Sequence, residues 1–87
     1  METVDASKLY QFLTELAEAA RSRGDHEMLR RLSEARTYYR MPLTSEFLGV
    51  SMTTLKLLLG HARHWLSEDQ AHRAESYADA IKQQFFS

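Results

Sequence analysis

The sequence predicts an all-α fold, a compact bundle of four to five helices in which residues 1–87 form a single domain. Apolar residues recur at helical intervals of three and four along almost the whole chain. No segment alternates between apolar and polar residues as a half-buried strand does. The length of 87 residues fits one domain, and a chain this short is marginally stable without good packing or a partner.

The first helix is expected to begin after Asp5 or Ser7, since either side chain can cap a helix N-terminus. Arg21 and Arg23 lie in its last turn, where cations interact favourably with the helix dipole. Gly24 then supplies the left-handed position that ends the helix. The apolar residues of this segment form one stripe: Leu9, Phe12, Leu13, Leu16 and Ala20.

The second helix is expected to have Asp25 as its N-cap and Glu27 in its first turn. Pro42 disfavours helical geometry in the residue before it, so this helix should end near Tyr39 or Arg40. Because only one residue turns between the first two helices, we expect them to form an antiparallel hairpin. The apolar stripe of the second helix is Met28, Leu29, Leu32, Ala35 and Tyr39.

The second half of the chain predicts a short helix over 45–48, ended by Gly49, and a longer one over about 52–66, capped by Ser51. The longer helix is apolar over most of its circumference, so it is predicted to be buried at the centre of the domain. Ser67 is the expected cap of the last helix. The stripe of that helix is Ala71, Ala74, Tyr77, Ala78, Ile81 and Phe85.

Residues 43–58 contain the parts that two helices joined by a tight turn require. Gly49 can supply the positive φ of the turn, and the apolar Leu48 and Val50 flank it. Two leucines three residues apart follow, so the second helix can bury them together. The segment therefore resembles the helix-turn-helix element of DNA-binding regulators, and it predicts a helix-turn-helix-like corner.

In that family, the exposed face of the second helix contacts base edges in the major groove. The resemblance therefore implies a transcription regulator that binds duplex DNA. It also implies a homodimer, because one weakly charged element binds DNA poorly. The candidate DNA-binding residues that match the exposed positions are Ser51, Met52, Thr53 and Lys56.

The positive charge of the chain is concentrated in residues 21–40, which hold six Arg against three acids, while the whole chain has a formal charge of −1. Three interpretations remain open: a face that contacts phosphates, a protein interface rich in Arg and Tyr, and a solvated face with local ion pairs. The candidates for phosphate or partner contact are Arg30, Arg31, Arg36, Arg40 and Tyr38.

The sequence predicts no enzyme, cofactor, metal site or small-molecule substrate. Without Cys there is no thiolate zinc finger or cysteine nucleophile, and no catalytic triad, carboxylate pair or Gly-rich phosphate loop is evident. His61, His64, Glu68 and His72 have helical spacing, but the expected start of a helix at Ser67 separates them into two groups.

The start of the chain predicts no secretory signal, and no apolar run approaches the ~20 residues of a membrane span. We therefore expect a cytoplasmic protein that has no membrane partner.

Two functions remain open, a DNA-binding regulator and a protein-binding module. The resemblance of residues 43–58 favours the first. The small size and the balance of 11 Lys and Arg against 12 Asp and Glu favour the second, such as an immunity, chaperone-like or anti-activator protein. An exposed, positively charged second helix would favour DNA, whereas a buried one would oppose its insertion into the groove.

Overall fold

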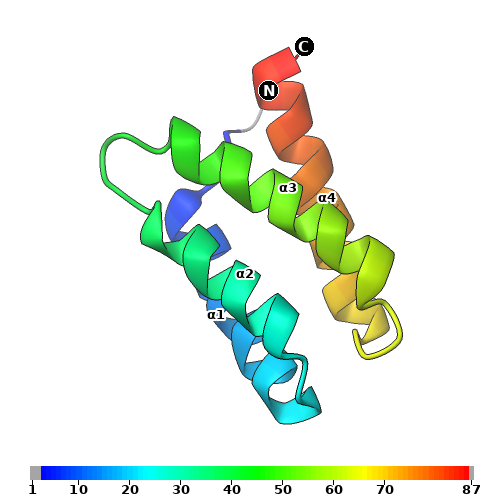
Figure 1. The fold of residues 1–87 in the computed structure, drawn as a ribbon. Coiled ribbons are helices and arrows are strands. Elements are labelled where there is room, and N and C mark those ends of the chain that lie inside the picture. The colour runs from blue at the N-terminus through cyan, green and yellow to red at the C-terminus, as the bar shows by residue number, and fades with distance from the viewer. Residues whose placement is uncertain (1–2, 87) are drawn as a thin grey trace.

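The protein is an all-α bundle, which confirms the predicted fold class. A computed structural model describes residues 3–86, and the side chains of residues 3–85. These residues form four helices and no strand (Figure 1): α1 (Ala6–Arg23), α2 (His26–Thr37), α3 (Ser45–His61) and α4 (Glu68–Phe86). The helices α1 and α2 form one hairpin, α3 and α4 form another, and α2 packs against α3.

The first hairpin begins and turns as predicted. Of the two candidate caps, Asp5 is the one that caps α1, and its carboxylate accepts a hydrogen bond from the Lys8 amide. Gly24 ends α1 with a left-handed φ of 72°, and Asp25 caps α2. Helix α2 ends at Thr37, two residues before the earliest predicted end.

The predicted break at Gly49 is wrong, and with it the helix-turn-helix-like corner. Gly49 lies inside the uninterrupted helix α3, and Gly24 is the one glycine with positive φ in the part of the chain that the structure describes. The physical reason is that the buried stripe of α3 continues through Gly49 at helical spacing, so a single helix buries all of it. That stripe is Phe47, Leu48, Ser51, Thr54, Leu55 and Leu58.

The central position predicted for the apolar helix is confirmed in one respect, since α3 packs against both α2 and α4. The helix ends at His61 rather than near Leu66. Its outer face is open to solvent, because Thr53 and Lys56 are exposed. Among the residues described, no helix combines the length and the hydropathy that crossing a membrane requires.

The core contains side chains from all four helices and from the α3–α4 loop, residues 62–67. Trp65 from that loop is 7 % exposed and closes one end of the core. Phe85, which the last predicted stripe included, is exposed instead. The largest fully buried apolar side chains are Leu9, Leu13, Leu16, Leu32, Phe47, Leu48, Leu55, Leu58 and Ile81.

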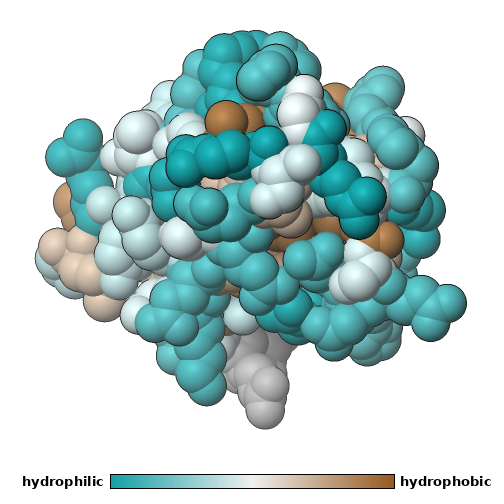
Figure 2. Space-filling model, turned by 90° about the horizontal axis from the view of Figure 1, so that it is seen from below, coloured by the Kyte–Doolittle hydropathy of each residue, from teal (hydrophilic) through white to brown (hydrophobic). Residues whose placement is uncertain are grey.

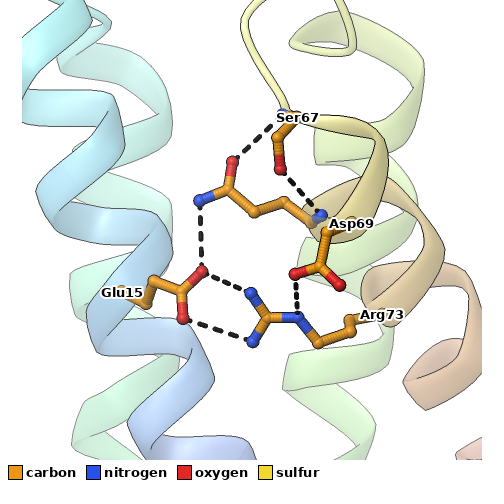
Figure 3. A network of polar contacts seen from close by, with 5 residues as sticks. Glu15, Ser67, Asp69 and Arg73 are labelled. Atoms are coloured by element: carbon orange, nitrogen blue, oxygen red, sulfur yellow. Dashed lines mark hydrogen bonds and ion pairs between the residues drawn. The ribbon is translucent and has the colours of Figure 1, made fainter.

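A polar network joins α1 to α4 across the bundle (Figure 3). Glu15 of α1 accepts hydrogen bonds from Arg73 at 2.6 and 3.2 Å and from Gln70 at 3.2 Å. The guanidinium of Arg73 is the main cause of the lowered pKa of Glu15. Arg73 also donates to Asp69, while the Ser67 hydroxyl and the Gln70 side chain cap the start of α4 reciprocally.

A single carboxylate joins the α1–α2 turn to the α3–α4 loop. One oxygen of Asp25 accepts a hydrogen bond from the Met28 amide at 3.1 Å and so caps α2. The other accepts a hydrogen bond from the indole Nε1 of Trp65 at 2.9 Å. These two hydrogen bonds, chiefly the one from Trp65, hold the pKa of Asp25 below its ordinary value of 3.8.

The stability of the protein should therefore depend on pH through Asp25. A carboxylate whose pKa is lowered by folding stabilises the folded state above its ordinary pKa, and this contribution disappears as the pH falls through the folded-state pKa. We expect the free energy of unfolding to fall between pH 5 and pH 2, and to fall less in Asp25→Asn. Urea denaturation followed by Trp65 fluorescence measures this free energy in both proteins. An equal fall with pH in the wild type and in Asp25→Asn would contradict the contribution of Asp25.

Candidate functional site

The α2–α3 loop, residues 38–44, exposes three large apolar side chains. Leu43 is 79 % exposed, Met41 67 % and Tyr38 38 %. Figure 1 shows this loop projecting from one side of the bundle. The face seen in Figure 2 is largely hydrophilic, with small apolar areas between polar side chains and at its left edge, the side on which the loop projects. Large apolar side chains gathered in one exposed loop are typical of interaction sites.

Tyr39 fixes this loop to the core. Its ring lies between two aromatic rings, with centroid distances of 4.9 Å to Tyr10 of α1 and 5.2 Å to Phe47 of α3. Such aromatic pairs stabilise packing beyond the area they bury. The loop is therefore held at one residue, while its neighbours Tyr38, Met41 and Leu43 extend outward.

A shallow groove begins beside this loop and follows the junction of α2 and α3. It consists of two hollows that share Arg31 as a lining residue. We call the two hollows together the α2/α3 groove. Its lining residues come from both helices and from the turn before α2: Asp25, Glu27, Met28, Arg31, Glu34, Tyr38, Glu46, Gly49, Val50, Thr53, Thr54, Leu57 and His61.

The lining of the α2/α3 groove contains four carboxylates but one guanidinium, that of Arg31. Arg30, which lies beside the groove on α2, forms ion pairs with Glu27 at 2.9 Å and Glu34 at 2.8 Å. The hydrogen bonds from Arg30 and then Arg31 lower the pKa of Glu27. Even with Arg30 included, the groove keeps an excess of negative charge, and Glu46 has no ion pair within residues 3–86.

The four candidate DNA-binding residues do not share one exposed face. Ser51 is fully buried and faces the core, which corrects its predicted position as an exposed helix cap. Met52 is half-buried against the core, whereas Thr53 and Lys56 are exposed. The cause is the continuity of α3, since Ser51 lies one turn after Phe47 on the buried stripe.

Among the candidates for phosphate or partner contact, Arg30 and Arg31 form the local ion pairs that one interpretation predicted. Arg30 binds Glu27 and Glu34, and Arg31 binds Glu27 at 2.8 Å. All four side chains are largely exposed, so these pairs add little stability. Arg31 also lines the α2/α3 groove, whereas Arg30 lies beside it.

The other three candidates lie apart. Arg36 donates a hydrogen bond to the Thr14 hydroxyl at 3.1 Å, and its guanidinium lies 5.9 Å from the centroid of the Tyr10 ring. It therefore joins α2 to α1. Arg40 is exposed in the α2–α3 loop, and Tyr38 lines the α2/α3 groove where that loop begins.

Met41 and Leu43 were not among the residues predicted to contact a partner. Their sequence carries a signal that could have found them, because both flank Pro42 and belong to no helical stripe. A large apolar residue in a loop, outside any buried stripe, indicates a side chain that the fold itself does not cover. Their degree of exposure, however, depends on how the loop lies on the bundle.

Comparisons of this chain with protein-family models, with curated proteins and with solved structures find no match. Within residues 3–86, no three His, Asp or Glu side chains lie close enough together to hold a metal ion. The function proposed below therefore depends on the geometry and charge of the loop and the groove.

The buried hydroxyl of Ser51 tests whether α3 is continuous and turns this residue toward the core. The Oγ atom has no hydrogen-bond partner in the described part of the chain, and a buried polar group in that state destabilises the fold. We expect Ser51→Ala to raise the free energy of unfolding by about 1 kcal/mol.

The matched control is Thr54→Ala, because the Thr54 hydroxyl donates to the Val50 carbonyl at 2.9 Å. This variant should be less stable than the wild type. Urea denaturation of the three proteins measures both effects, and a destabilised Ser51→Ala variant would show that the hydroxyl is bonded in the folded state.

Proposed function

We propose that this chain is a non-enzymatic protein-binding module that recognises its partner with the α2–α3 loop and the α2/α3 groove. The observation that carries the proposal is the exposure of Met41 and Leu43 in a loop that Tyr39 holds to the core. Apolar side chains that the fold leaves in water bind a partner favourably, since fully burying one such side chain stabilises an interface by roughly 1.5–3 kcal/mol.

The charge of the neighbouring groove supports a protein partner over DNA. Neutralisation of phosphates by Lys and Arg supplies much of the affinity of DNA-binding proteins. The α2/α3 groove instead carries more carboxylates than guanidiniums, and Lys56 is the one cation among the four residues that the helix-turn-helix resemblance indicated. Binding to duplex DNA remains a prediction that only the sequence resemblance of residues 43–58 supports.

The expected location and assembly state follow from the sequence. The absence of Cys is compatible with a reducing compartment, and we propose that the partner is met in the cytoplasm. A second copy of the chain is one protein that could cover the loop, and the experiment below distinguishes it from a different partner by mass.

Photo-crosslinking from Leu43 tests the proposed function. The photoreactive residue p-benzoylphenylalanine replaces Leu43, whose 79 % exposure makes the substitution compatible with folding, and the full chain is irradiated in its host cells. We expect one discrete protein adduct, identified by mass spectrometry. The adduct should disappear when Met41→Asp is added, because the partner then loses a neighbouring apolar contact.

The control carries the same photoreactive residue in place of Lys82, which is exposed on α4 outside the loop and the groove. This position should give no discrete adduct. Equal adducts from both positions, or none from position 43, would contradict the proposal.

A further inference from the structure

Each hollow of the α2/α3 groove has one half-buried apolar side chain of α3 in its lining, and Thr53 and Thr54 lie between the two. These two side chains, Val50 and Leu57, lie seven residues apart, which corresponds to about 10 Å along a helix. Met28 of α2, which is buried, lines the same hollow as Leu57. Two apolar side chains at this spacing match two positions of the apolar stripe that a short amphipathic helix presents over two turns.

Carboxylates line the groove on both sides, and those of α2 form ion pairs within the chain. Glu27 and Glu34 stand on the α2 side and Glu46 on the α3 side. Arg30 and Arg31 engage the two carboxylates of α2, but Glu46 has no ion pair within residues 3–86. An occupant with cationic side chains beside its apolar stripe would complement this lining, whereas an acidic one would be repelled.

Gly49 opens the groove at the end nearest the α2–α3 loop. A glycine inside a helix destabilises it relative to Ala, and a Cβ atom built on Gly49 meets nothing within 4 Å. Within the part of the chain that the structure describes, no packing contact therefore requires glycine at this position. The missing side chain instead leaves room for the backbone of an occupant to come close to α3.

From these three features we infer that the α2/α3 groove binds a basic amphipathic helix of the partner protein. The inference rests on the proposed function and adds the chemistry of the partner. The apolar stripe of the bound helix covers Val50 and Leu57, its backbone passes Gly49, and a Lys or Arg side chain beside the stripe pairs with Glu46.

Two synthetic helical peptides of 18 residues test the inference against the full-length chain. One carries an apolar stripe of Leu with Lys elsewhere, and the other carries the same stripe with Glu in place of Lys. We expect the Leu/Lys peptide to bind at 0.15 M salt and to shift the amide resonances of Gly49, Val50 and Leu57. The Leu/Glu peptide should bind at least tenfold more weakly.

Two pairs of variants separate groove binding from general attraction between opposite charges. Glu46→Lys and Asp79→Lys change the net charge equally, but Asp79 is exposed on α4 outside the groove. Gly49→Gln and Gly60→Gln both add a side chain where a Cβ atom meets nothing within 4 Å, and Gly60 lines neither hollow of the groove. The first variant of each pair should lose at least tenfold in affinity, and the second should keep the wild-type value.

Equal losses within either pair, shifts confined to other faces, or equal binding of the two peptides would overturn the inference. So would a 30-base-pair DNA duplex that shifts the resonances of the groove in place of the Leu/Lys peptide. If the Leu/Lys peptide fails while position 43 still gives a discrete protein adduct, the inference fails and the proposed function stands. If both fail, the proposed function falls as well.

Discussion

The carboxylate of Asp25 is a polar contact that joins the two hairpins through their turns. One of its oxygens caps α2, and the other accepts a hydrogen bond from Trp65 in the α3–α4 loop. Because α1 and α2 form one hairpin while α3 and α4 form the other, this contact fixes the first hairpin against the second. Hydrogen bonds to a charged acceptor are stronger than those between neutral groups, so one residue can hold both elements.

The α2/α3 groove lies between two such fixed points. At one end Asp25 lines the groove while it binds Trp65, and at the other Tyr39 packs between Tyr10 and Phe47. The Glu15–Arg73 contact holds α1 to α4 independently of α2 and α3. The walls of the groove are therefore positioned before any partner arrives, which lowers the entropy that binding must overcome.

Local signals in the sequence predicted the helices and most of their ends, because caps and apolar spacing act within a few residues. Asp5, Asp25 and Ser67 are caps in the structure as predicted. The sequence could not decide whether a helix ends at Gly49, because glycine permits a turn without requiring one. In the structure the buried stripe of α3 continues through this residue.

The candidate site was harder to predict, because exposure depends on packing between distant segments. The burial of Ser51 follows from the continuity of α3. Asp25 and Glu27 join the lining of the α2/α3 groove because the start of α2 lies beside the C-terminal half of α3. The basic character of residues 21–40 in the sequence is accordingly reduced by local ion pairs in the fold.

A double-mutant cycle between Asp25 and Trp65 measures most directly whether their hydrogen bond joins the two hairpins. Asp25→Ala, Trp65→Phe and the double variant are compared with the wild type by chemical denaturation at pH 7, followed by far-ultraviolet circular dichroism. If the hydrogen bond fixes the hairpins, the two residues should be coupled by about 1–2 kcal/mol. Additive effects, with no coupling beyond experimental error, would contradict the role assigned to Asp25.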